Sequence, residues 1–181
     1  MERTNKMKKL VCICSLLLWA VVSMGQDVSN VIGQYVDQAE VYQKIPKKRI
    51  KEIVDQAEQK KDMDAEASAF ISQILDKTKT LEVLILKSKP DVIQPFVEQI
   101  NSLDEKYETM VSVKQGKADV SIRTLSKRKK VREILVTVLF KDKAAIAVLL
   151  EGKYNPEDIN EELFKNAIKI KKIRKQKGLL K

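Results

Sequence analysis

The sequence predicts an α+β domain with a mostly antiparallel sheet of about four to five strands and helices packed on one face. Two or three helices precede the sheet, and a basic C-terminal helix closes the chain. Three observations predict this class: an apolar hairpin near the end, a second hairpin with one polar face, and helical apolar stripes ahead of both.

The most apolar stretch predicts a β-hairpin in the middle of the sheet. Its arms are 131–140 and 144–150, and Lys141-Asp142-Lys143 separates them. Apolar residues occupy both alternating faces of each arm, so we expect little water on either side. Nothing in this hairpin is chemically reactive, so we interpret it as scaffold.

A second hairpin follows from Gln115-Gly116, which we expect to be a two-residue turn. In that register Val111 lies opposite Val120 and Val113 lies opposite Ala118. The other side is polar: Ser112, Lys114, Lys117, Asp119 and Ser121. One wet face indicates that helices cover only one surface of the sheet.

The remaining elements precede the hairpins. We expect a weak helix after Asp27, a short edge strand over 40–45, helices after Pro46 and from Asp62 or Asp64, a central strand over 81–87, and a helix opened by Pro90 and Asp91. The apolar stripes of the last three helices are Ile50, Ile53, Val54 and Ala57; Ala67, Phe70, Ile71, Ile74 and Leu75; and Ile93, Phe96, Val97, Ile100 and Leu103.

Residues 1–25 have the three parts of a secretory signal peptide, namely a basic start, an apolar core and small residues around Met24. We expect cleavage between Gly25 and Gln26, and hence export to the periplasm or beyond. An uncleaved anchor would need about 20 apolar residues, and this run is shorter. Lipid attachment at Cys12 or Cys14 is disfavoured, because both lie too early in the apolar core.

Three segments are therefore expected: a signal peptide over 1–25, one α+β domain over 26–164 and a basic tail over 165–181. The mature chain would have 156 residues and no Cys, Trp or His. This composition excludes disulfides, cysteine nucleophiles, histidine bases and zinc sites built on Cys or His. After cleavage no transmembrane span is expected.

The positive charge is concentrated in the tail. Of the net +10, the leader contributes +3, so the mature chain carries +7. From Lys165 onward there are eight basic residues and no acid, which leaves the body near −1.

Several segments together resemble a known family. They are the leader, the strand Leu81–Leu86, a helix ending near 107–113, the paired strands, and the closing 149–159 with its Gly-x-x-x-x-x-Asp-Ile pattern from Gly152 to Ile159. Over about 40–159 the chain resembles the domain of unknown function 4252 family, small exported proteins of Bacteroidota. The resemblance implies no activity and no catalytic residues, and the basic tail is not a feature of that family.

Two patterns for catalysis or metal binding are weak. Asp62, Asp64 and Glu66 imitate the start of a calcium loop, but Ala67 and Gln73 stand where that loop needs glycine and glutamate. We interpret the acids as helix-capping residues. No Gly-x-Ser-x-Gly or Ser-x-x-Lys motif occurs, so we expect no enzyme, no catalytic residues, no metal and no cofactor.

The tail is the one candidate binding element. We expect Asn155 to cap a helix that begins at Pro156 and carries one apolar stripe, Ile159, Leu163, Ala167, Ile170 and Ile173. Phe164 and Ile168 lie on the lysine side. The expected anionic-surface site is Lys165, Lys169, Lys171, Lys172, Arg174, Lys175 and Lys177.

Two interpretations of the tail stay open. In the first, the stripe docks on the domain and the lysines are merely solvated. In the second, the tail binds an anionic envelope surface, with each basic residue contributing about 1 kcal/mol before screening and Phe164 and Ile168 inserting shallowly. Nucleic acid is a poorer partner, because no aromatics interleave with the lysines. The leading hypothesis is a non-catalytic envelope protein that binds an unidentified protein, a lipid or a glycan, with the tail as an electrostatic anchor; the alternative is an enzyme that uses Asp, Glu, Ser or Lys in a cleft.

Overall fold

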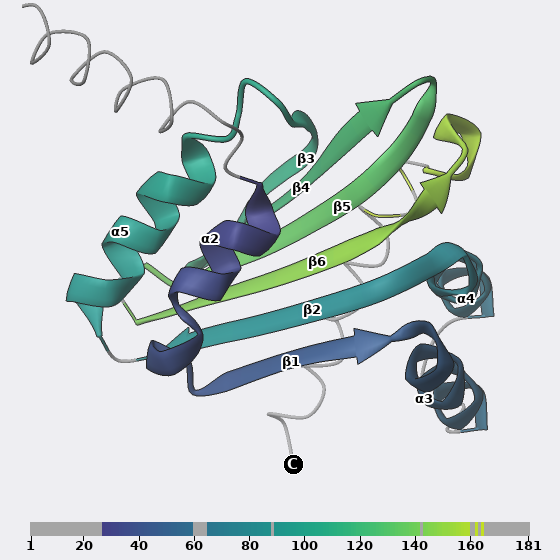
Figure 1. The fold of residues 1–181 in the computed structure, drawn as a ribbon, viewed down its shortest axis with the longest axis horizontal. Coiled ribbons are helices and arrows are strands. Elements are labelled where there is room, and N and C mark those ends of the chain that lie inside the picture. The colour runs from purple at the N-terminus through teal and green to yellow at the C-terminus, as the bar shows by residue number, and fades with distance from the viewer. Residues whose placement is uncertain are drawn as a thin grey trace, which may run out of the picture.

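The computed structural model describes residues 27–59, 65–87, 89–141, 143–159, 162 and 164. They form one antiparallel sheet in the order β1-β2-β6-β5-β4-β3, with helices on both of its faces (Figure 1). The strands are β1 Val41–Pro46, β2 Thr78–Lys87, β3 Glu108–Gln115, β4 Ala118–Lys127, β5 Lys130–Leu139 and β6 Ala144–Tyr154. The helices are α2 Val28–Gln34, α3 Lys47–Gln59, α4 Ala65–Lys77 and α5 Pro90–Asn101, with short 3₁₀ turns η1 Val36–Gln38 and η2 Pro156–Asp158.

The α+β class and the antiparallel sheet are confirmed, but the expected count of four to five strands was too low. The edge strand expected over 40–45 forms as β1 and pairs with β2, with Val41 opposite Ile85, so it counts as the sixth strand of the sheet. The partner of a short edge strand is far away in the sequence, so the sequence alone does not show that it joins the sheet.

The first face of the sheet is covered by α2 and α5, which lie over it in Figure 1. Val28, Ile32, Phe96 and Ile100 from these helices pack with one set of strand residues, Leu84, Leu86, Leu135, Ala145, Ala147 and Leu149. Alanine at the centre of this face leaves room for helices to approach closely.

The second face carries its own core at one end, which corrects the expectation that helices pack on one face only. Phe70 and Ile74 of α4 are 4% exposed and pack with Ile134, Leu150 and Tyr154 from the opposite side of the strands. Because the central strands are apolar on both sides, both faces lose water contact only if each receives a helix.

The turn between β3 and β4 lies one residue later than expected. Gly116 and Lys117 form it, so Val113 lies opposite Val120 and Val111 opposite Ile122. Gly116 has φ +61°, a conformation that glycine adopts at little cost. Moving the turn by one residue shifts the pairing by two positions, so every side chain keeps its predicted face.

Candidate functional site

The tail begins at a junction held by Asp158. Its carboxylate accepts hydrogen bonds from Gln73 Nε2 (3.0 Å), Lys77 Nζ (2.5 Å) and the backbone N–H of Asn155 (2.9 Å). The bond from Lys77 is the main reason that the pKa of Asp158 lies below its ordinary value. Asp158 therefore joins the segment after β6 to the C-terminal end of α4.

Aromatic packing fixes the last described residue. The rings of Phe164 and Phe70 meet edge to face with centroids 4.9 Å apart, and Phe164 is partly buried against the core of the second face. Ile159 is 6% exposed in the same cluster. Phe164, which the sequence analysis places on the lysine side, therefore packs on α4 in this structure.

The residues of the expected anionic-surface site lie outside the described residues, as do residues 1–25, where a signal peptide is expected, and most of the expected basic helix. That site comprises Lys165, Lys169, Lys171, Lys172, Arg174, Lys175 and Lys177. In place of the first turn of the helix expected from Pro156, the structure has the short 3₁₀ turn η2, and Ile159 just after it is not helical. Helical backbone is described again at Glu162 and Phe164.

A second basic element lies beside the tail's origin. Lys127, Arg128, Lys129 and Lys130 form the tight turn between β4 and β5, and all four are exposed. The turn residues Arg128 and Lys129 have φ 54° and 61°. Lys130 Nζ donates a hydrogen bond to Asn155 Oδ1, the residue just before η2. From the sequence these four residues were expected only as the link between the two hairpins. The tight turn was not predicted, because it lacks the Asn-Gly pair that is typical of such turns.

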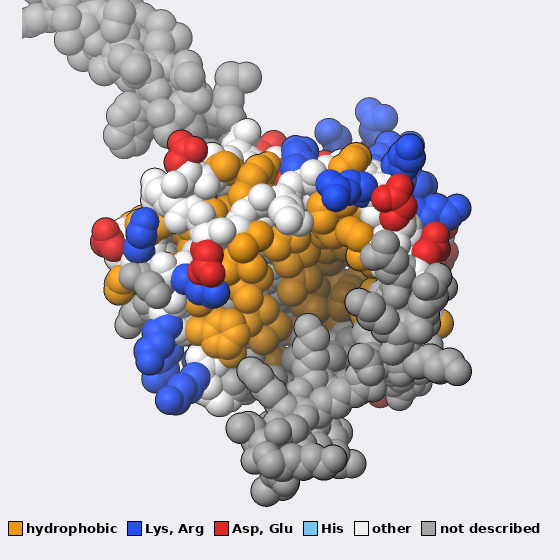
Figure 2. All heavy atoms as spheres, turned by 90° about the horizontal axis from the view of Figure 1, so that it is seen from below, with side chains coloured by type: hydrophobic (Ala, Val, Ile, Leu, Met, Phe, Trp, Pro, Cys, Tyr) orange, Lys and Arg blue, Asp and Glu red, His pale blue; other side chains and the backbone are white. Residues whose placement is uncertain are grey.

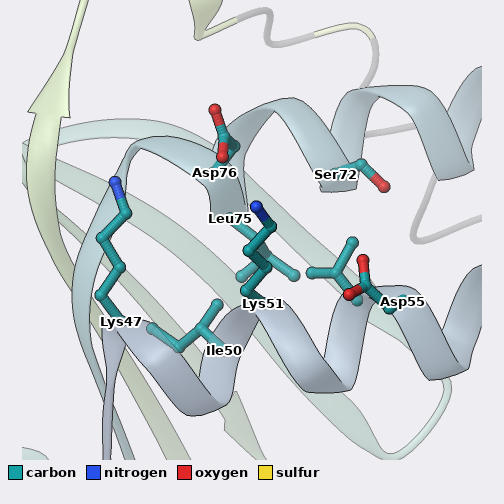
Figure 3. Close-up of a pocket in the computed structure, with 8 residues that line it drawn as sticks. Lys47, Ile50, Lys51, Asp55, Ser72, Leu75 and Asp76 are labelled. Carbon is teal, nitrogen blue, oxygen red and sulfur yellow. The ribbon is translucent and has the colours of Figure 1, made fainter.

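A cavity of about 190 Å³ lies between α3 and α4 (Figure 3). Lys47 and Lys51 extend from α3 toward α4, while Asp55 and Asp76 supply the opposite charges. Its floor includes Ile50 and Leu75. The two lysines and two aspartates that line the cavity have no net charge, so the cavity has no electrostatic preference for a charged ligand.

Titratable groups gather instead on the first face, at the ends of the central strands. Glu133 of β5 lies directly opposite Glu151 of β6, and Tyr107 donates its hydroxyl to Glu133 Oε2. Burial raises the pKa of Glu133, and the charges of Glu151 and Asp27 add to that rise. Burial likewise raises the pKa of Tyr107.

On β2, which pairs with β6, the side chain of Glu82 is 1% exposed and has two polar partners at one of its oxygens. Lys44 forms an ion pair with Glu82 Oε1, and Ser29 Oγ donates to the same oxygen at 2.9 Å. Lys44 belongs to the edge strand and Ser29 to α2, so this carboxylate connects three elements. A buried charge with such partners is a structural tie.

The calcium-like acids do not form a described site. Asp62 and Asp64 fall outside the described ranges, and Glu66 lies in the first turn of α4. Within the ranges that are described, no three acidic side chains converge in a way that could hold a metal ion. In the same ranges no helix is both long enough and apolar enough to cross a membrane.

Comparison with known proteins gives one match. A protein-family model described as "Domain of unknown function (DUF4252)" matches residues 45–161, more than half of the chain. No curated protein and no solved structure matches the chain.

Proposed function

The chain belongs to the DUF4252 family, whose function is unknown, and we propose that this member is an exported, non-catalytic binding protein that docks on an anionic surface through its basic tail. The single observation that carries the proposal is the charge distribution. Eight basic residues and no acid follow Phe164, whereas the body is close to neutral.

The junction supports this proposal, because it holds the tail's origin in place. Asp158 is bonded to α4 through Lys77, and Phe164 packs on Phe70 of the same helix. A basic segment with a fixed origin presents its charges from one end of the domain. An anionic surface that engages the tail therefore meets that end first.

The turn at 127–130 adds charge at the same end. Its four basic residues are exposed, and Lys130 reaches Asn155 at the base of η2. Each Lys or Arg near an anionic membrane contributes about 1 kcal/mol before salt screening. Tail and turn together supply twelve such residues, enough to hold a small domain at a surface at low salt.

The enzymatic alternative is less well supported by the geometry. Glu133, the acid with the raised pKa, lies on the first face of the sheet, where Tyr107 occupies one of its oxygens. The cavity between α3 and α4 lies on the other side and is lined by Lys47, Lys51, Asp55 and Asp76 among others. A cleft enzyme needs the perturbed acid to line the cavity.

Vesicle co-sedimentation tests the proposal. The chain from Gln26 contains every described residue, and it should pellet with anionic vesicles but not with neutral ones, and be released by salt. Stopping the chain after Phe164 should abolish pelleting. Replacing Lys169, Lys172 and Lys175 together with Gln should weaken binding roughly 10- to 100-fold, whereas replacing them with Arg should leave it nearly unchanged.

Equal pelleting of the full and truncated chains would overturn the role of the tail. Equal binding to anionic and neutral vesicles would overturn electrostatic docking. Circular dichroism of each variant shows whether the domain remains folded, so a loss of binding can be assigned to charge.

A further inference from the structure

An apolar row crosses the second face of the sheet beyond the part that α4 covers. One residue from each strand contributes, and the register places them side by side: Val41, Ile85, Ile146, Val138, Val120 and Val113. All except Val120, which is 8% exposed, are classed as partly exposed. Figure 2 shows hydrophobic side chains gathered in a broad, hollowed patch on the underside of the molecule.

Part of this row is left out of both cores. Ile85, Val138 and Ile146 belong to neither of the two hydrophobic clusters that the described residues form, although they lie on three adjacent inner strands, β2, β5 and β6. Apolar side chains in the middle of a sheet are normally covered, because each one contributes about 1.5–3 kcal/mol on full burial. A segment that covered this row would therefore bury apolar surface and stabilise the protein.

The chain itself brings a segment to this face. Ile159 and Phe164 are both packed into the cluster of the second face, so residues 165–181 start there. These 17 residues include a continuation of the apolar stripe, Ala167, Ile170 and Ile173, and then Leu179 and Leu180.

The lengths also agree. As a helix, 17 residues would span about 25 Å at 1.5 Å per residue. Six strands about 4.8 Å apart span roughly 24 Å across the sheet. A tethered segment is present at an effective concentration in the millimolar range, which favours it over a second copy of the chain in dilute solution.

We propose that residues 165–181 dock on the cross-sheet row with Ala167, Ile170 and Ile173 facing the sheet, so that their lysines face outward as an ordered array. This inference deepens the proposed function and rests on it for the role of the array. Docking itself requires no anionic surface, so the two can be tested separately.

Thiol labelling without vesicles tests the docking, because the mature chain has no cysteine of its own. Ile146→Cys places a thiol in the row, and Asp119→Cys places one at an exposed position on the opposite face. In the chain from Gln26 the maleimide reaction at position 146 should be roughly tenfold slower or more than in the same chain stopped after Phe164. The reaction at position 119 should not change.

A disulfide test gives the orientation. Ile146→Cys combined with Ile170→Cys should cross-link within one chain faster than Ile146→Cys combined with Lys172→Cys, which lies on the other side of the expected helix. Ile85→Cys serves as a second row position if the variant at Ile146 does not fold.

Equal labelling in the long and short chains, or equal cross-linking of both pairs, would overturn the docking. Protection that depends on protein concentration would assign the row to a second copy and would also overturn it. Protection without vesicle binding would leave the docking standing and refute the proposed function; vesicle binding without protection would do the reverse.

Discussion

Asp158 Oδ2 lies 2.5 Å from Lys77 Nζ, and this ion pair joins the end of α4 to the segment that leads into the tail. The two side chains are 10% and 31% exposed, so the pair is partly shielded from water. Gln73 and the backbone of Asn155 complete the set of donors around the carboxylate. Removing the charge of Asp158 therefore weakens its hydrogen bonds with Lys77, Gln73 and the backbone of Asn155 together.

Asp158→Asn should destabilise the protein by about 1–2 kcal/mol at pH 7, because a charge-assisted bond is lost. The pKa of Asp158 is lowered in the folded protein, so its contribution is present above its ordinary value of 3.8 and fades as pH falls through the lowered pKa. Urea unfolding of Asp158→Asn and of the natural chain, at pH 7 and again at a pH below 3.8, measures how the difference in unfolding free energy changes with pH. Glu157→Gln, at an exposed neighbour, is the control, and an equal loss there would contradict the assignment.

Gly152→Ala should destabilise the protein by about 1–3 kcal/mol through overpacking. A methyl group at this position would lie 2.5 Å from the carbonyl oxygen of Lys77 and 2.7 Å from the ring of Tyr154. The ring is fully buried and the carbonyl is backbone, so neither can move away easily. Thermal unfolding should show the loss, and Gly33→Ala is the matched control because nothing lies near that position.

Gly152 and Asp158 are two positions of the closing pattern that forms part of the family resemblance, and both have a structural role. The first is required where a strand passes close to a carbonyl and a ring, and the second where a turn is tied to a helix. Each of these local contacts requires a particular residue type at its position, and that residue type can be read in the sequence. The central hairpin was predictable from the sequence, because its two nearly continuous apolar runs indicate strands that are buried on both faces.

Features that depend on distant contacts were not predictable. The contact between Phe164 and Phe70 is an example, because helical spacing alone does not show that two residues far apart in the sequence pack together. The face covered by α4 was missed because an apolar stripe does not say which side of a sheet it joins. Glu133 and Tyr107 carry no motif at all and meet only through folding.

Glu133→Gln should stabilise the protein at neutral pH. The pKa of Glu133 is raised in the folded state, so the folded protein holds this proton more tightly than the unfolded chain does. Its contribution to stability is therefore greatest near or below the ordinary value of 4.5 and is lost as pH rises through the raised pKa. Glutamine is uncharged at every pH and can still accept the bond from Tyr107.

The measurement is the difference in unfolding free energy between Glu133→Gln and the natural chain across this range. The difference should favour the variant at pH 7 and shrink toward pH 4.5. Glu105→Gln, at an exposed position, should show no such trend. A variant that is less stable at pH 7 would indicate that the ionised carboxylate is needed where it lies.

Phe164→Ala should cost about 1–2 kcal/mol, since it removes partly buried apolar area and the edge-to-face contact with Phe70. Phe140→Ala is the matched control, because that ring is 36% exposed and its loss should cost under about 0.5 kcal/mol. Chemical unfolding of both variants gives the comparison. Equal costs would mean that the junction does not hold the tail's origin.

Replacing the basic turn with Asn-Gly should stabilise the domain while weakening its attraction to anionic vesicles. Arg128 and Lys129 hold φ 54° and 61°, where a side chain costs about 1–2 kcal/mol per residue and where Asn and Gly are tolerated. Arg128→Asn with Lys129→Gly should therefore raise the unfolding free energy by about 1–2 kcal/mol. Gly116→Ala, at φ +61° in the other turn, should lower it by about 1 kcal/mol. If Arg128 and Lys129 contribute to binding, the double variant should be more stable and should also bind anionic vesicles more weakly. A gain in stability with unchanged vesicle affinity would show that the turn is not part of the binding surface.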